Sequence, residues 1–504
     1  MTGYRPGRAW VAVACALILP LGYLSLDAID VVPGVLTSDL GHEDRVPAPP
    51  TGSGAPSAEA VSTTEPADTD SGSEQRRPKP AVPGSDAALA APDPAAPQPT
   101  RDGLAAVLGP LLRDPTLGTS VGMEVRDGLT GRVLFGQSAA TPRTPASATK
   151  VLTAAAIAQV EDLSQRFETR VVVVDADTVA LVAGGDNLLA AGEGDPGSVA
   201  GQAGLANLAR ATSAALGPST RSVRVLLDDR FAAGPTLAPG WARADVALGL
   251  TGPVAMLGLS TDRATPYRPA GTDPAMLATS AFAHALEAAG VRVQGQPARA
   301  AAPPGATELA VVRSAPVYDV LALALDESDN DLTETVSRWA CARGGASTTF
   351  AGCAGWLRER IGAAGLDVSS ARLVDTSGLS GGTHASAALV AGAVTFGVVP
   401  AAPQAGQTAH RQLAQVLAQL PVAGLSGTLQ DRFLAPVTRA GVGVVRAKTG
   451  TLTGVGSLAG TVVDSQGRLL AFAVLADRVP VGGTSAARLT LDRLAAVLAA
   501  CGCS

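Results

Sequence analysis

The pattern of apolar positions separates an ordered part of the chain, from about residue 103 onward, from a long polar segment before it. Leucines and a valine repeat at helical spacing over residues 104–112, which predicts a helix. Alternating segments at 120–124 and 133–136 predict a hairpin. The apolar stretch 146–160 opens directly after Pro145 and predicts a long helix, because proline favours the first helical position.

Strands and helices then alternate along the rest of the chain, which indicates an α/β (α+β) fold. Residues 167–182 predict two strands, 199–216 a helix and 221–228 another strand, and together they form a separate α+β unit. Gly, Pro and Asp accumulate at 232–240 and 261–274, where we expect the chain to leave this unit. The other expected elements are helices at 276–289, 317–325 and 486–500 and strands at 291–294, 441–448, 455–463 and 469–475.

Residues 1–31 predict a membrane anchor or an export signal. An apolar run from Ala9 to Leu26 lies between two arginines and two aspartates. Its eighteen residues are just enough to span a bilayer, and no small-x-small cleavage site follows cleanly, so an uncleaved anchor is favoured over a cleaved signal. The preceding arginines would keep the N-terminus cytoplasmic. We therefore expect an extracytoplasmic protein of the cell envelope, anchored by residues 9–26, or a secreted one if the segment is cleaved.

Residues 32–100 are dense in Pro, Ala, Ser, Thr, Gly and Asp and show no apolar periodicity. Such a composition buries too little surface to fold. The segment is predicted to be a disordered linker, extended by its prolines, that holds the folded part away from the membrane.

Charge and metal-ligand content exclude several classes of partner and site. The net charge is −6, and no basic cluster occurs beyond residues 76–79, so we expect no nucleic acid partner. Only four histidines occur, widely scattered, and there is no Cys-x-x-Cys, so we expect no metal site.

Four cysteines lie outside the apolar run, and an even number in an oxidising compartment favours disulfides. We predict a bond between Cys341 and Cys353. Pairings of these two cysteines with Cys501 and Cys503 remain alternatives, as do buried free thiols.

Lysine is scarce: the chain has three lysines against thirty-five arginines. Lys79 lies in the Pro-rich segment, whereas Lys150 and Lys448 stand in short polar motifs. Arginine replaces lysine wherever only charge is needed, but only a lysine amine can be desolvated into a base. We therefore expect that the chain retains lysine where that difference matters for chemistry.

The first motif is Ser147-x-x-Lys150 at the start of the predicted helix. Residues three apart share one helix face, so the two side chains are expected within hydrogen-bonding reach. A desolvated lysine can then act as the base that activates the serine hydroxyl, and the helix N-terminus favours negative charge on a substrate oxygen. Taken alone, this pair is also common by chance.

The second motif, Ser328-Asp329-Asn330, lies between two helical segments. In an extended loop, residues i and i+2 point the same way, so Ser328 and Asn330 would enter one cleft while Asp329 points into the protein. The alternative interpretation is ordinary helix capping, for which Ser, Asp and Asn are all suited.

The third motif, Lys448-Thr449-Gly450-Thr451, ends a β-rich run. Gly450 would let the backbone approach a ligand closely, and Lys448 with the two threonine hydroxyls would bind a carboxylate. The alternative is a solvated strand end.

In this order, the three motifs resemble the signature set of penicillin-binding proteins and class A β-lactamases. The resemblance is closest to the class C low-molecular-mass penicillin-binding proteins, the D-alanyl-D-alanine carboxypeptidase/endopeptidase family, and covers about residues 101–500. Residues 145–155 resemble that family's nucleophile block, 375–380 its Asp-x-Ser-Gly-Leu-Ser element, 426–429 and 447–452 its closing blocks, and 184–186 a Gly-Gly-Asp in its inserted domain.

The resemblance implies a serine β-lactamase/transpeptidase-like domain, an antiparallel sheet flanked by helices, with an α+β domain inserted between the first and second motifs. The 177 residues between Lys150 and Ser328 leave room for such an insertion. The expected domains are the penicillin-binding catalytic domain in two parts, 101–165 and 275–504, and the inserted domain, 166–274. Family members often carry a second nested insertion, which this interval is too short to hold in full.

By the same resemblance, the substrate is a peptidoglycan stem peptide, and β-lactam antibiotics are covalent inhibitors. Ser147 would attack the penultimate carbonyl with Lys150 as base, and the backbone N–H groups of Ser147 and Thr451 would stabilise the oxyanion. Ser328 would pass a proton to the leaving amine, and no cofactor is implied. The substrate-binding residues would be Asn330, Lys448, Thr449, Gly450 and Thr451.

Two other functions share parts of this pattern. A serine β-lactamase needs a deacylating base, and no Glu-x-x-x-Asn element follows the second motif to supply it. A non-catalytic cell-wall-binding module would keep the fold and lose the motif residues, which are all present here. The sequence leaves open the balance between carboxypeptidase and endopeptidase action.

Overall fold

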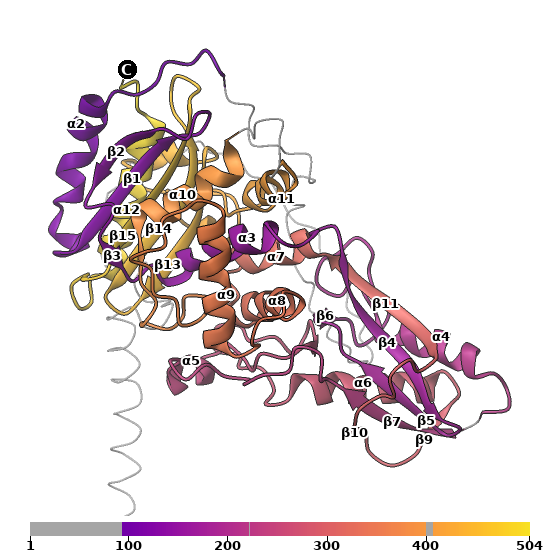
Figure 1. Cartoon of the computed structure of the whole chain (residues 1–504). Coiled ribbons are helices and arrows are strands. Elements are labelled where there is room, and N and C mark those ends of the chain that lie inside the picture. Colours follow the sequence, from indigo (N-terminus) through magenta and orange to yellow (C-terminus); the bar gives the residue numbers. More distant parts are fainter. Residues whose placement is uncertain (1–92, 221, 400–406, 504) are drawn as a thin grey trace, which may run out of the picture. The chain divides into compact units, whose positions relative to one another are not determined.

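The computed structural model describes residues 93–220, 222–399 and 407–503 (Figure 1). The predicted anchor, and the predicted linker up to residue 92, lie outside the described residues. Within the described ranges, no helix combines the length and the apolar character needed to cross a bilayer.

A five-stranded antiparallel sheet forms the first layer, in the order β13-β14-β15-β1-β2. The C-terminal strands thus pair with the N-terminal hairpin, with Met123 opposite Val474. The bounds are β1 Val121–Asp127, β2 Val133–Gln137, β13 Val445–Leu452, β14 Val455–Val463 and β15 Leu469–Ala476. Strand β13 is at the edge of this sheet, and in its first half the Ala423 amide donates to the Val445 carbonyl and the Ala447 amide to the Pro421 carbonyl.

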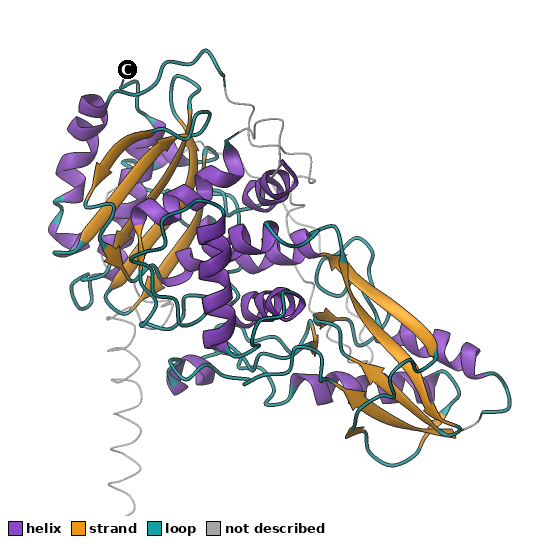
Figure 2. Ribbon diagram, viewed as in Figure 1, coloured by secondary structure: helices purple, strands orange, loops and turns teal. Residues whose placement is uncertain are grey.

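Helices cover both faces of this sheet (Figure 2), which explains why the central strand β15 is apolar at every position. Successive side chains of a strand point to opposite faces. Phe472 and Val474 belong to the core beneath α2 (Arg101–Leu112) and α12 (Thr484–Ala499), whereas Ala473 and Leu475 belong to the core beneath α10 (Ala387–Val398).

A group of helices packs around α3 (Thr149–Ala158), and all ten residues of α3 are buried. Its small alanine side chains allow close approach of its neighbours on every side. These neighbours are α7 Val317–Asp326, α8 Asn330–Arg343, α9 Phe350–Ala363, α10 and α11 Gln407–Ala418. The 3-10 turn Ala146–Ala148, which directly precedes α3, contacts β13 and so connects the helical group to the sheet edge.

A second, mixed sheet has the order β10-β7-β5-β4-β11, with β9 pairing with β7. Its strands are β4 Arg166–Asp175, β5 Thr178–Val182, β7 Ser222–Asp228, β9 Arg292–Val293, β10 Ala298–Arg299 and β11 Glu308–Pro316. Helices α4 (Leu205–Leu216) and α6 (Pro274–Ala288) pack on each other, α4 also contacting β11 and α6 also contacting β7. Helix α6 and strands β9 to β11, which follow the predicted end of the inserted domain at residue 274, therefore complete this second sheet and its helical cover.

The remaining elements are short. They are the strands β3 Pro142–Arg143, β6 Asp186–Leu189, β8 Leu257–Leu259 and β12 Ala385–Ser386, the helix α5 Arg243–Ala247, and the 3-10 turns Pro115–Leu117, Ala146–Ala148, Gly427–Leu429 and Arg439–Gly441.

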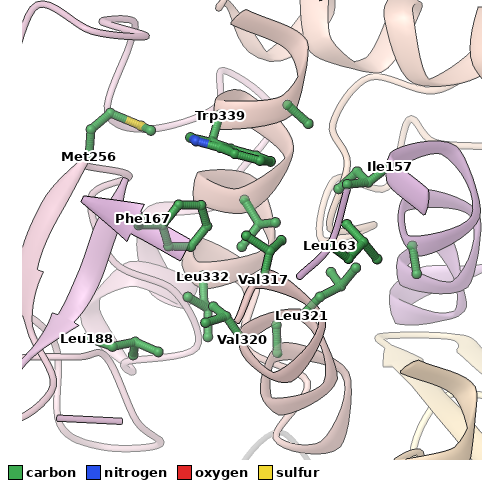
Figure 3. Close-up of a cluster of buried hydrophobic side chains, with 14 of the residues drawn as sticks. Ile157, Leu163, Phe167, Leu188, Met256, Val317, Val320, Leu321, Leu332 and Trp339 are labelled. Atoms are coloured by element: carbon green, nitrogen blue, oxygen red, sulfur yellow. The ribbon is translucent and has the colours of Figure 1, made fainter. Parts of the chain in front are cut away.

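The core is continuous from α3 through α7 and α8 to the second sheet (Figure 3). Phe167 of β4 meets Trp339 of α8 edge to face, with ring centroids 5.2 Å apart. Val317 and Leu321 of α7 continue this core toward Ile157 of α3. The second sheet therefore packs directly on the helices that carry the motif residues.

The start of the described chain lies on the folded domain. Arg468 donates to Asp127 and to the carbonyl oxygens of Pro94 and Ala96. Thr100 accepts from the Gly103 amide and so caps α2. Pro94, Ala96 and Thr100, within the end of the predicted linker, are therefore bonded to the folded domain.

Two disulfides are present in the described residues. Cys341 pairs with Cys353, which confirms the predicted bond and joins α8 to α9. Cys501 pairs with Cys503 directly after α12.

Candidate active site

Ser147 is placed by a sharp turn at the start of α3. The preceding Ala146 has a φ of 47°, a left-handed conformation that costs a non-glycine residue about 1–3 kcal/mol. A hydrogen bond of 2.8 Å from Thr149 Oγ1 to the Ala146 carbonyl supports this turn. Ser147 stays partly exposed, whereas Ala146 and Ala148 are buried. The turn therefore presents a serine hydroxyl to solvent from a rigid base.

Lys150 lies one turn further along and is wholly buried. Its Nζ donates to Ser147 Oγ at 3.1 Å, to Asn330 Oδ1 at 2.6 Å and to the Ser377 carbonyl at 2.9 Å. These acceptors come from the 3-10 turn before α3, from α8 and from the 375–380 segment. The first and second motifs therefore meet at one amine.

The pKa of the Lys150 amine is lowered toward neutral pH. Burial lowers its pKa from 10.5 to about 8, because a charged ammonium is poorly solvated inside the protein. Nearby carboxylates oppose this shift and keep the pKa from falling further; they belong to Asp329, Asp375, Glu334 and Asp331. A lysine with such a pKa can accept a proton at physiological pH.

A second serine–lysine pair lies beside the first. Lys448 of β13 donates from Nζ to Ser328 Oγ at 2.8 Å and to the Thr449 carbonyl at 2.8 Å. Lys448 is wholly buried, and burial together with the positive charge of Lys150 lowers its pKa well below the usual value. The alternative interpretation, a solvated strand end, is therefore wrong for Lys448.

The second motif differs from the extended loop that we predicted. Ser328 is left-handed, with a φ of 57°, and Asn330 is the first residue of α8. Asp329 caps this helix by accepting from the Leu332 amide at 2.9 Å. Capping and site formation therefore occur together, since Ser328 contacts Lys448 while Asn330 contacts Lys150.

Strand β13 passes the nucleophile at Gly450. A Cβ atom added there would lie 2.2 Å from Ser457 Oγ, 2.7 Å from the Pro145 carbonyl oxygen and 3.0 Å from the Ser147 amide nitrogen. Only glycine lets the strand run this close to the backbone of the turn. Thr451, the next residue on β13, is partly exposed.

A Gly450→Ala variant is expected to acylate about 100-fold more slowly with a β-lactam, because the methyl group forces β13 away from the Ser147 backbone. Stopped-flow measurement of the second-order acylation rate tests this. Gly355→Ala on α9, where an added Cβ meets nothing within 4 Å, is the matched control and should keep the parent rate. Equal rates for Gly450→Ala and the parent would contradict the geometry.

The three motifs taken singly did not indicate that Thr428 and Ser377 also contribute to the site. Thr449 Oγ1 donates to Thr428 Oγ1 at 3.0 Å, and Ser377 supplies the carbonyl that accepts from Lys150. Both lie in blocks that carry the family resemblance, so that signal was available. Glu334 and Asp375 are also buried near Lys150. Asp375 lies in the 375–380 block, whereas Glu334 has no sequence signal beyond its place one helical turn after Asn330.

In the part of the chain that the structure describes, no group of three or more His, Cys, Asp or Glu side chains is arranged to hold a metal ion. The site is built instead from hydroxyl, amine, amide and carboxylate groups of the chain itself.

A partly exposed serine beside a buried basic lysine, with a second serine–lysine pair and the edge strand β13 next to it, defines a serine acyl-transfer enzyme of the penicillin-binding type. The chain belongs to the D-Ala-D-Ala carboxypeptidase 3 (S13) family, whose sequence profile matches residues 104–267 and 260–499.

Relatives support this assignment over most of the chain. Carboxypeptidase DacB of Mycolicibacterium smegmatis is 38% identical over 419 residues, which cover 82% of this chain and 87% of that protein. Carboxypeptidase Rv3627c of Mycobacterium tuberculosis is 34% identical over 416 residues, 81% of this chain and 86% of that protein. Penicillin-binding protein 4 of Haemophilus influenzae shares the fold at a TM-score of 0.61 and 18% identity, covering 77% of this chain and 97% of the solved chain.

The predicted family and fold class are confirmed: the chain is a class C low-molecular-mass penicillin-binding protein with a transpeptidase-like fold. It is a serine-type D-Ala-D-Ala carboxypeptidase, and the β-lactamase and non-catalytic alternatives are not favoured.

Proposed function

We propose that Ser147 is the nucleophile of this carboxypeptidase and that Lys150 is the base of the acylation step. The observation that carries this proposal is the contact of 3.1 Å between Lys150 Nζ and Ser147 Oγ, made by an amine that burial brings to a pKa of about 8. The Ser147 proton passes to Lys150 as Oγ attacks the carbonyl carbon of the penultimate D-alanine. The peptide C–N bond then breaks, and an ester to Ser147 remains.

The developing oxyanion is stabilised by the backbone N–H groups of Ser147 and Thr451. The close approach of β13 at Gly450, with the Ser147 amide 3.0 Å from the position of an added Cβ, supports this assignment. Two N–H donors fixed before the reaction stabilise the transition state without reorganisation, which typically contributes about 3–4 kcal/mol per donor.

Ser328 passes a proton to the leaving amine, and Lys448 holds Ser328 in place through the bond of 2.8 Å. Asn330 binds the substrate amide. Its Nδ2 donates to the Leu250 carbonyl at 2.7 Å and its Oδ1 accepts from Lys150, so the direction of its amide group is fixed. Water then hydrolyses the ester and returns Ser147 to its hydroxyl form.

The terminal carboxylate of the substrate binds at β13. The hydroxyls of Thr449 and Thr451 contact it, with the buried amine of Lys448 behind them. The bond between Thr449 and Thr428 supports this, because it places a further hydroxyl beside β13.

The substrate is a peptidoglycan stem peptide, and β-lactams acylate the same serine because their amide and carboxylate resemble the D-Ala-D-Ala end. A Haemophilus influenzae penicillin-binding protein 4 of this fold was solved in complex with a β-lactam, at 17% identity and a TM-score of 0.55. The proposed location is outside the cytoplasmic membrane, with residues 9–26 as anchor.

Release of D-alanine from a pentapeptide ending in D-Ala-D-Ala tests the proposed function. The full chain should release D-alanine, and a saturating β-lactam should block the release. Digestion of purified sacculi, followed by mass analysis of the fragments, then divides carboxypeptidase from endopeptidase action. Failure to release D-alanine or cross-linked fragments from any substrate would refute the proposed hydrolysis.

A further inference from the structure

We propose that Glu334 is a positioning residue that directs the lone pair of Lys150 toward Ser147 by holding the Ser377 carbonyl in place. This inference rests on the proposed role of Lys150 as base. It concerns a residue outside the three motifs, on α8, one turn after Asn330.

Glu334 is buried and binds one peptide segment with both carboxylate oxygens. Its Oε1 accepts from the Thr376 amide at 2.9 Å and the Ser377 amide at 2.7 Å, and its Oε2 accepts from Thr376 Oγ1 at 2.7 Å. These three bonds fix both the position and the rotation of the Thr376–Ser377 peptide group.

The carbonyl groups of the same segment are bonded to α3. Ser377 accepts from Lys150 Nζ at 2.9 Å, and Thr376 accepts from Thr153 Oγ1 at 2.6 Å. The segment is thus held between α8, which binds its amides, and α3, which binds its carbonyls. Removing the Glu334 carboxylate would free one of these two sides.

The direction of the lone pair follows from the number of hydrogens on the amine. A neutral lysine amine has two N–H bonds and one lone pair, whereas three acceptor atoms surround Lys150 Nζ. Asn330 Oδ1 and the Ser377 carbonyl can only accept, so they take the two hydrogens. The lone pair then faces Ser147 Oγ, which is the one neighbour that can donate. Loss of the Ser377 acceptor would let the amine rotate away from this arrangement.

Glu334 also acts through its charge, and this second effect can be separated from the first. Its negative charge favours the ammonium form of Lys150. Burial and the charge of Asp375 raise the pKa of Glu334 itself to about 7, against the bonds from Thr376 and Ser377. The charged groups that face Lys150 or Glu334 are Asp329, Asp331, Asp375, Lys448 and Arg338.

Two substitutions of Glu334 separate the effect of its hydrogen bonds from the effect of its charge. Glu334→Gln keeps an oxygen that accepts from both amides, and it loses the charge, whereas Glu334→Ala loses both. Ser337→Ala is the matched control, because Ser337 lies on the same helix, is wholly buried, and its hydroxyl has no hydrogen-bond partner among the described residues.

The second-order rate of acylation by a fluorescent penicillin, measured from pH 5 to pH 10 in the full chain, tests the proposal. Acylation needs neutral Lys150, so the rate rises with pH through the Lys150 pKa. Glu334→Gln should keep the high-pH rate within about threefold and move this rise to lower pH, because a lost negative charge lowers the lysine pKa. Glu334→Ala should reduce the high-pH rate by about 10- to 100-fold, because the amine is misdirected.

The proposal is overturned if Glu334→Ala retains the parent rate at high pH, or if Ser337→Ala loses as much as Glu334→Ala. Should Glu334→Ala fail to fold by circular dichroism, Glu334→Leu, which fills the same space without an acceptor, takes its place in this measurement. Failure of the proposed function gives a different result, since the parent chain itself would then not be acylated.

Discussion

A Ser147→Ala variant is expected to lose all covalent labelling by a fluorescent penicillin and all release of D-alanine from a pentapeptide. The variant keeps the buried Lys150 and the neighbouring Ser328–Lys448 pair, but it has no oxygen at the position where the ester forms. Neither amine substitutes for that oxygen, because both are wholly buried. Gel fluorescence and intact-mass analysis, which reads the added penicilloyl mass, measure the labelling.

The control for this variant is Ser337→Ala, which removes a hydroxyl from α8 and should label like the parent chain. Non-covalent binding of the penicillin should survive in Ser147→Ala, since the strand edge and its hydroxyls are unchanged, and equilibrium dialysis can measure it. A penicilloyl mass on the variant would show that another residue is the nucleophile. That result would also remove the basis of the roles assigned to Lys150 and Ser328.

Much of the sheet could be predicted from the sequence because local signals set its strand ends. Strand β14 has the predicted bounds of 455 and 463, since a turn at Gly454 precedes it and another at Gly467 follows it. The apolar run of β15 also gave its position. Its two-sided burial could not be predicted from that run, because it depends on α2 and α12 over one face and on α10 over the other, which are far apart in the sequence.

The end of the inserted region could not be predicted for a related reason. Strand β11 has an irregular burial pattern and pairs with β4, which lies more than one hundred residues earlier. Its pairing also includes two register shifts, so its sequence does not alternate regularly. The loop-rich segment before Pro274 therefore resembled a domain boundary, whereas α6 continues the same unit.

In the candidate site, too, features set by local sequence could be predicted and features set by tertiary packing could not. The residue types of Ser147, Lys150 and Lys448 indicated their chemistry because each motif is local in sequence. The backbone of Ser328 and the contacts of Glu334 depend on tertiary packing, and no spacing rule gives them. Lys448 was expected mainly as a charge beside a carboxylate, yet it is wholly buried against Ser328. We therefore infer that position 448 is a lysine because the buried space beside Ser328 accommodates its narrow amine group.

Lys150→Arg is expected to reduce the acylation rate by about 10²- to 10⁴-fold, although it keeps the positive charge. The guanidinium group stays protonated at every pH at which the protein folds, so it cannot take the Ser147 proton. It is also wider than the ammonium that contacts Ser147, Asn330 and Ser377 within 3.1 Å. The second-order acylation rate with a fluorescent penicillin, read from pH 6 to pH 10, measures the loss.

The pH profile separates the loss of the base from a mere change of fit. In the parent chain the rate should rise through about pH 8, where Lys150 becomes neutral, and Lys150→Arg should stay flat across this range. Lys150→Met, which removes the amine without adding a planar charged group, should be equally slow, and it decides the question if the arginine variant fails to fold. Lys79→Arg makes the same chemical change outside the described residues and should leave the rate unaltered. Acylation by Lys150→Arg at near the parent rate would mean that another group accepts the proton. The buried pair of Lys448 and Ser328 would then be tested first, because it is the other serine–lysine contact of the site.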